Sequence, residues 1–294
     1  MTFEIKIIKF LQNISNHYLD ILAEAITMLG EQYVIIIILA FIYFVHNKKE
    51  GEYIAYSLFT SLALNNTLKG VFQRKRPFQI DNSIIGKRAS TATGFSFPSG
   101  HTQTSAVFYT SLSEILNSKK FKIISLVIIL LVAISRMYLG VHYLSDIVMA
   151  ILLGMSCSYL GLFLYKRFKD NDTKKLLLFI ITAAVFFPFI FIFYQYDFES
   201  ITPFRDFYTG YSLFLGFIGA VYIENKYVNF DCSNPLKIRI IRYLIALVFF
   251  IVTMFGLKLI LPENNIFIDM LRYFLVTFIT MGIYPLIFKK QLFS

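Results

Sequence analysis

The side chains best suited to chemistry fall in one short run, residues 135–146, where a guanidinium, an imidazole and a carboxylate lie among apolar residues. If His142 and Asp146 are helical, their i,i+4 spacing places both on one face of the helix. The carboxylate can then fix the imidazole tautomer and stabilise its cationic form. Such a pair suits a histidine nucleophile. Arg136 precedes it across a segment that contains Gly140, so its charge can turn toward the same point and meet an anion such as phosphate.

Two earlier stretches carry polar groups of the same kind. Lys69, six further residues, and then Arg76-Pro77 form the first, and Pro98-Ser99-Gly100-His101 forms the second. The second stretch lies where a helix is expected to begin, so unpaired backbone N–H groups and the positive end of the helix dipole are available to an oxyanion.

Other basic residues near these stretches have simpler interpretations. We expect Arg74 and Lys75 to contact anionic lipid headgroups or solvent. Lys87 and Arg88 could form a gate for an anionic substrate, but a solvated loop is favoured.

The elements that must position these residues belong to a very apolar chain. Of 294 residues, 57% are hydrophobic, 18% aromatic and only 16% charged, which is typical of a polytopic membrane protein. Runs long enough to span a bilayer, bounded by charge, occur at residues 31–46, 52–71, 101–117, 123–138, 142–165, 174–196, 207–224, 241–261 and 267–288. Residues 3–29 are amphipathic and are expected to form interfacial or half-inserted helices. The sequence therefore predicts an all-α membrane helical bundle.

The basic residues indicate how the bundle is oriented. A net charge of +10 could suggest a nucleic-acid partner, but the Lys and Arg residues cluster between apolar runs, so membrane topology explains them better and no nucleic-acid partner is expected. The clusters at residues 48–49, 119–122 and 166–169 fall on one side if the helices alternate, and the positive-inside rule makes that side cytoplasmic. Lys69, Ser99 to His101, Arg136 and His142 then all lie at helix ends on the opposite face. We expect a plasma-membrane protein with an extracytoplasmic site.

Taken together, the three stretches resemble the three-part signature of the type 2 phosphatidic acid phosphatase superfamily, a group of membrane lipid phosphatases. The resemblance covers roughly residues 31–165. It implies a six-helix phosphatase core, which we place within residues 1–170. Residues 171–294 would be a C-terminal extension of further transmembrane helices with no assigned role.

The resemblance also implies a role for each matching residue. His142 would attack phosphorus and form a phosphohistidine, and Asp146 would orient it. His101 would protonate the leaving oxygen and then activate water. The phosphoryl oxygens would be bound by Lys69, Arg76, Ser99, Gly100 and Arg136. The scheme needs no metal or other cofactor, and no cluster of Asp and Glu with ligand-like spacing lies near these residues to hold magnesium.

The expected partners are membrane lipids and a lipid phosphate or diphosphate substrate. A site at the membrane–water boundary suits a substrate whose head group lies in water and whose chain lies in lipid. Undecaprenyl diphosphate is the first candidate, and phosphatidylglycerophosphate, phosphatidate and sphingoid-base phosphates are others. Two alternatives remain. One is a phosphotransferase that passes the phosphoryl group to an acceptor hydroxyl, and the other is a transporter or scaffold with relic motifs. The intact motif residues argue against the latter. The sequence leaves the oligomeric state open.

Overall fold

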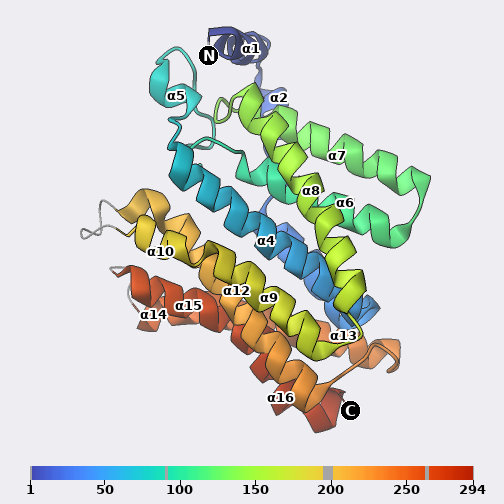
Figure 1. The fold of residues 1–294 in the computed structure, drawn as a ribbon. Coiled ribbons are helices and arrows are strands. Elements are labelled where there is room, and N and C mark those ends of the chain that lie inside the picture. The colour runs from blue at the N-terminus through green and yellow to red at the C-terminus, as the bar shows by residue number, and fades with distance from the viewer. Residues whose placement is uncertain (1, 90–91, 195–200, 262–264, 294) are drawn as a thin grey trace. The chain divides into compact units, whose positions relative to one another are not determined.

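The computed structural model describes residues 2–89, 92–194, 201–261 and 265–293 (Figure 1). Within these ranges the regular structure is helical and no strand occurs, which confirms the predicted all-α class. The first half of the chain contains α1 (Thr2–Asn13), α2 (His17–Met28), α3 (Gln32–Phe41), η1 (Ile42–His46), α4 (Lys48–Phe72), α5 (Pro77–Ile80), α6 (Gly100–Leu116), α7 (Lys119–Tyr138) and α8 (Leu144–Phe168).

The second half is also a succession of helices, several of which are interrupted by a π-helical turn. It contains α9 (Asp172–Phe186), α10 (Pro188–Ile192), η3 (Thr202–Phe204), α12 (Arg205–Ile223), η4 (Glu224–Val228), α13 (Leu236–Ile251), η5 (Val252–Gly256), α14 (Leu257–Ile260), α15 (Ile266–Phe278), η6 (Ile279–Ile283), α16 (Tyr284–Ile287) and η7 (Lys289–Phe293).

Several of these helices can cross a bilayer. Among the described residues, five are long and apolar enough by length and composition: Lys119–Tyr138, Leu144–Phe168, Asp172–Ile192, Leu236–Ile260 and Ile266–Ile287. A sixth is reached if His17–Met28 and Gln32–His46, which meet at a 43° bend, form one broken span. The predicted interfacial stretch 3–29 therefore consists of α1 and α2, and α2 belongs to this bent pair.

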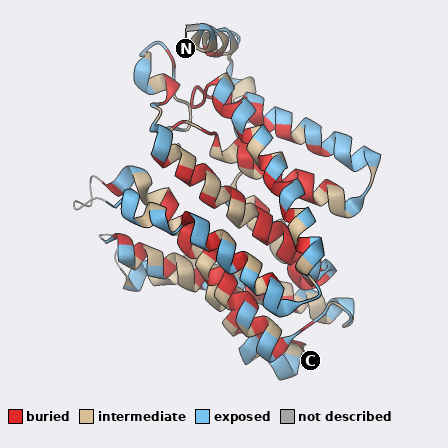
Figure 2. Cartoon of the chain, in the orientation of Figure 1, coloured by how far each residue is buried: buried red, intermediate tan, exposed pale blue. Residues whose placement is uncertain are grey.

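The chain forms two compact units, and α3, α4 and α8 contribute residues to both. The first unit comprises residues 1–35 and 64–160. In it α6 and α7 pack side by side, and α1 and α2 pack against α7. A buried apolar cluster joins α1 to α7 and to the start of α8; its members are Ile8, Ile84, Ala133, Met137, Tyr143 and Ile147. The outer face of α7 is apolar and exposed, as expected for a surface in contact with lipid (Figure 2).

The second unit comprises residues 36–63 and 161–294. Here α12 packs along α15, and an aromatic cluster built on Tyr43, Phe44, Phe230, Tyr284 and Phe293 forms part of the core. The buried ion pairs of this unit include Lys175–Glu52 at 2.7 Å and Lys48–Glu224. The division of the sequence into residues 1–170 and 171–294 stays a prediction.

Candidate active site

The candidate nucleophile lies in the short connection between α7 and α8, within the first unit. Gly140 has φ +72°, and a Cβ there would lie 2.5 Å from the carbonyl oxygen of Ile85, so the connection needs glycine to turn so tightly. α8 begins at Leu144, so His142 lies two residues before the helix and the predicted helical i,i+4 geometry is wrong in detail. The predicted pairing is nevertheless present, because Nδ1 of His142 lies 3.3 Å from Oδ2 of Asp146.

The carboxylate of Asp146 is completely buried and its two oxygens have different partners. Oδ2 accepts hydrogen bonds from the Tyr143 backbone N–H at 2.9 Å and from the Ser96 hydroxyl at 2.5 Å, and it faces His142. The bond from Tyr143 is a helix cap: the acidic side chain of Asp146, in the first turn of α8, accepts from a backbone N–H at the start of that helix. Oδ1 accepts from Nη1 of Arg74 at 2.8 Å. Asp146 is therefore fixed before any substrate binds.

The second imidazole nitrogen of His142 faces a cation. Nη1 of Arg76 lies 3.2 Å from Nε2, so the geometry assigns the proton of the neutral ring to Nδ1 and the lone pair to Nε2. Burial, together with the positive charges of Arg76, Arg136 and Lys69, holds the pKa of His142 well below its usual range. The ring is thus neutral at physiological pH, as a nucleophile must be.

Arg76 is held rigidly by backbone carbonyl groups. Its Nη2 donates to Thr93 O at 2.6 Å, its Nε to Gly94 O at 3.2 Å and its Nη1 to Val141 O at 3.1 Å. The side chain is 2% exposed. These bonds to two separate loops fix the guanidinium next to the imidazole, as an electrostatic catalyst requires.

Arg136, in the last turn of α7, is the other buried arginine of the site and is 1% exposed. Nη1 donates to the Thr27 hydroxyl of α2 at 3.0 Å, while Nε is buried with no hydrogen-bond partner among the described residues. A buried guanidinium N–H without a partner is costly, and an anion bound beside it would satisfy it.

The second stretch begins α6 as predicted, with Ser99 at the N-cap and Gly100 as the first helical residue. The Ser99 backbone N–H donates to the carbonyl oxygen of Asp146 at 3.2 Å, which joins this stretch to α8. A Cβ on Gly100 would lie 3.7 Å from Nζ of Lys69, so the lysine reaches the start of α6. The Ser99 hydroxyl, which the resemblance assigns to the phosphoryl oxygens, donates to Thr102 Oγ1 at 3.0 Å in this structure.

His101, in the first turn of α6, is accompanied by an acid from another part of the chain. Its Nε2 is buried, lies 4.0 Å from Oε1 of Glu31 and has no hydrogen-bond partner among the described residues. The same Glu31 oxygen accepts from Arg88 at 2.6 Å. Arg88 therefore forms an ion pair instead of lying in a solvated loop, and Lys87 likewise pairs with Asp20 at 2.5 Å.

All eight residues predicted for the site lie in the first unit, and contacts between Arg76 and His142, between Ser99 and Asp146 and between Lys69 and Gly100 connect the three stretches to one another. The sequence interpretation missed several supporting residues, namely Glu4, Glu31, Arg74 and Ser96. For Arg74 it was wrong: its guanidinium contacts Asp146 and Glu4 instead of lipid or bulk water. The sequence did contain a sign that Arg74 has a role in the site, because it belongs to a basic cluster on the side of the membrane where positive charge is disfavoured.

Two family models match the sequence of this chain. The sequence model of the PAP2 superfamily matches residues 51–172, and that of the PAP2 superfamily phosphatase transmembrane extension matches residues 208–292. The chain contains a PAP2 superfamily domain followed by a PAP2 transmembrane extension. The predicted resemblance is thereby confirmed. The PAP2 region includes the eight candidate residues, and the extension explains why further helices follow the phosphatase region.

Two relatives of this PAP2 protein carry names that describe lipid phosphatases. Phosphatidylglycerophosphatase B of Bacillus subtilis is 34% identical over 146 residues, which are 47% of this chain and 66% of that protein. Undecaprenyl-diphosphatase of Sulfolobus acidocaldarius is 31% identical over 134 residues, which are 45% of this chain and 64% of that protein. The matched region thus spans slightly less than two thirds of each relative.

Two solved structures are also similar to the PAP2 chain. The crystal structure of Aquifex aeolicus LpxE has a TM-score of 0.49 at 23% identity and covers 54% of this chain and 94% of its own. The transmembrane PAP2-type phosphatidylglycerolphosphate phosphatase of Bacillus subtilis has a TM-score of 0.46 at 28% identity and covers 57% of this chain and 85% of its own. The apolar helices and the transmembrane extension together make the PAP2 chain an integral membrane protein.

Proposed function

We propose that this PAP2 protein is a membrane phosphatase that hydrolyses a lipid phosphate or diphosphate through a phosphohistidine on His142. One observation carries the proposal. Nε2 of His142 presents its lone pair 3.2 Å from the guanidinium of Arg76, while Nδ1 is held by Asp146 at 3.3 Å. A nucleophilic nitrogen thus lies, buried, next to a cation that can bind the phosphoryl group that the nitrogen attacks.

Burial and the charge of Arg136 lower the pKa of His101, so its ring takes up a proton only as the negatively charged phosphoryl group binds beside it. In the first half-reaction, Nε2 of His142 attacks phosphorus, the bond from phosphorus to the leaving oxygen breaks, and the protonated His101 gives its proton to that oxygen. The positive charge that develops on the imidazole is stabilised through Nδ1–H by Asp146. Arg76, Arg136 and Lys69 balance the charge on the phosphoryl oxygens in the transition state.

In the second half-reaction, water attacks the phosphohistidine. The neutral His101 takes a proton from the water as the N–P bond breaks, and inorganic phosphate leaves with His142 neutral again. Because Nε2 of His101 is buried and lacks a hydrogen-bond partner among the described residues, it is available to exchange a proton with a bound oxygen.

The names of the relatives support a lipid substrate. One is named for a phosphatidylglycerophosphate and the other for undecaprenyl diphosphate, so both a monoester and a diphosphate are candidates. Undecaprenyl diphosphate remains the first candidate. The site lies at the start of α6 and the end of α7, at the opposite end of these helices from Lys119, Lys120 and Lys122. By the positive-inside rule this supports an extracytoplasmic site, in a protein that we propose lies in the plasma membrane.

A phosphate-release panel tests the proposal. The purified protein in detergent would be offered phosphatidylglycerophosphate, undecaprenyl diphosphate, phosphatidate and glucose 6-phosphate, with His142→Ala compared against His17→Ala, which changes an exposed histidine of α2. We expect release from at least one lipid, none with His142→Ala, and normal release with His17→Ala. Preference for glucose 6-phosphate, or phosphate that appears on an added alcohol instead of in solution, would replace the proposal with a soluble-ester phosphatase or a phosphotransferase.

A further inference from the structure

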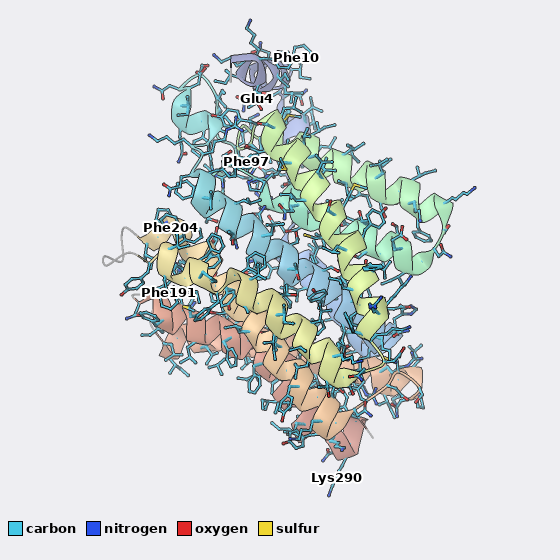
Figure 3. All side chains as sticks on the ribbon, in the orientation of Figure 1. Glu4, Phe10, Phe97, Phe191, Phe204 and Lys290 are labelled. Atoms are coloured by element: carbon cyan, nitrogen blue, oxygen red, sulfur yellow. The ribbon has the colours of Figure 1, made fainter. Side chains whose placement is uncertain are left out.

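Arg74 joins two carboxylates that come from distant parts of the chain. Its Nη1 donates to Oδ1 of Asp146 at 2.8 Å, and its Nη2 donates to Oε2 of Glu4, on α1, at 3.0 Å. The guanidinium also lies 3.9 Å from the centre of the ring of Tyr143, which directly follows His142 in the sequence. Figure 3 shows Glu4 on the side of α1 that faces the start of α8. A continuous chain of charges therefore runs from the first helix to His142.

Glu4 also holds the start of α8 itself. Its Oε1 accepts from the Ser145 backbone N–H at 2.8 Å and from the Ser145 hydroxyl at 2.7 Å, so it caps a free N–H group of the first helical turn. Burial alone would raise the pKa of Glu4, but the hydrogen bonds from Ser145 and the charge of Arg74 outweigh it and lower the pKa. Glu4 is therefore a carboxylate at neutral pH.

The charges of these groups matter for the nucleophile. When His142 attacks phosphorus, its imidazole becomes cationic and needs the negative charge of Asp146. Arg74 alone would neutralise Asp146 and compete with the imidazolium for it. Glu4 neutralises Arg74 in turn, so the three groups together keep one net negative charge beside His142. At the same time, Arg74 fixes Oδ1, which leaves Oδ2 directed at the imidazole.

We propose that Glu4 and Arg74 are positioning residues for the nucleophile: Arg74 orients Asp146, and Glu4 balances the charge of Arg74 so that Asp146 can stabilise the His142 cation. This inference rests on the proposed function of the same site. It gives the first helix, α1, a part in catalysis although it lies outside the matched PAP2 region.

Other contacts hold α1 in place, so the charge of Glu4 can be changed without releasing the helix. Ile8 is buried in the cluster against α7, and Gln12 donates to Ile85 O at 2.7 Å and accepts from Ile85 N at 3.0 Å. Lys9 pairs with Asp81 at 2.8 Å. Lys9 is thus a matched control, because it anchors the same helix through an ion pair that does not touch Arg74 or Asp146.

The test is a double-mutant cycle on Glu4→Gln and Arg74→Gln, with Lys9→Gln as the control. The measured quantities are the single-turnover rate of His142 phosphorylation and the KM for the lipid found active in the panel. We expect Glu4→Gln to slow phosphorylation by about tenfold with little change in KM, because a nearby charge is removed and no phosphate contact is lost. Lys9→Gln should retain the normal rate.

The cycle gives a second, independent criterion. In the Arg74→Gln background, Glu4→Gln should have much less effect than in the normal protein, because no uncompensated cation is left beside Asp146. Equal effects in both backgrounds, or a Glu4→Gln rate equal to that of Lys9→Gln, would overturn the positioning role. An active wild type and an inactive His142→Ala in the same assay would show that the proposed function stands even if this inference fails.

Discussion

Nη1 of Arg76 lies 3.2 Å from Nε2 of His142, so the arginine expected to bind the substrate already donates toward the lone pair of the nucleophile. In the proposed mechanism, an incoming phosphoryl group takes this donor from the imidazole. As its oxygens bind the guanidinium, Nε2 becomes free to attack. The mechanism thus couples substrate binding to activation of the nucleophile through one side chain.

This coupling predicts that Arg76 cannot be replaced by another cation. Arg76→Lys keeps the charge but loses the planar fork that bonds Thr93, Gly94 and Val141. We expect kcat/KM to fall by about 10²–10³-fold, the usual effect of removing one preorganised donor. Steady-state phosphate release measures it. Lys75→Arg, at an exposed neighbour, is the control and should be neutral. A fully active Arg76→Lys would remove Arg76 from the site.

Arg136 is expected to act mainly on phosphate affinity. Its buried Nε lacks a hydrogen-bond partner among the described residues, so a bound oxyanion would gain a charge-assisted hydrogen bond there. Arg136→Gln should weaken competitive inhibition by inorganic phosphate by about tenfold or more, since hydrogen bonds to charged groups contribute about 1.5–3 kcal/mol. Thr27→Val, which removes only the partner of Nη1, should have a smaller effect. Unchanged inhibition in Arg136→Gln would contradict a phosphate-binding role.

The loss of phosphorylation rate on replacing His101 should depend on how strongly the leaving oxygen needs a proton. For a lipid alcohol as leaving group, His101→Ala should slow phosphorylation by about 10²–10⁴-fold. For a nitrophenyl phosphate, whose leaving group departs without protonation, the loss should be much smaller. Burst kinetics with the two substrates measures the difference. Equal losses for both would mean that His101 binds the phosphoryl group instead of acting as a general acid.

The low pKa of His142 predicts how phosphorylation depends on pH. Burial and the charges of Arg76, Arg136 and Lys69 lower this pKa, so the ring stays neutral as the pH falls through the usual value of about 6.5. With nitrophenyl phosphate, which does not need the proton of His101, the burst rate should therefore hold steady below about pH 6.5. A tenfold loss per pH unit below that value would show an ordinary histidine pKa.

The convergence of the three stretches could be predicted from the sequence because each lies at a helix end, and the parity of the apolar runs puts those ends on one face. Lys69, Gly100 and Arg136 occupy the predicted helix ends, and Arg76 contacts His142 as a shared site requires. The resemblance supplied the roles of these residues, and those roles stay predictions.

The supporting contacts could not be predicted in the same way. Glu4 meets Arg74 across 70 positions, and Glu31 meets Arg88 across 57, and neither pairing leaves a periodic signal in the sequence. They depend on how the connection between α4 and α6 folds over the helix ends and on how α1 docks. The charge of Arg74, on the side of the membrane where basic residues are disfavoured, was the one usable sign, and it was interpreted as a lipid contact.

Trapping the covalent intermediate tests the phosphohistidine mechanism most directly. The protein would be mixed with a radiolabelled lipid phosphate, quenched within a turnover in alkali, digested, and the labelled peptide sequenced. We expect an acid-labile, alkali-stable phosphate on His142, absent from His142→Ala and present in His17→Ala. Label on another residue, or turnover by His142→Ala, would contradict it.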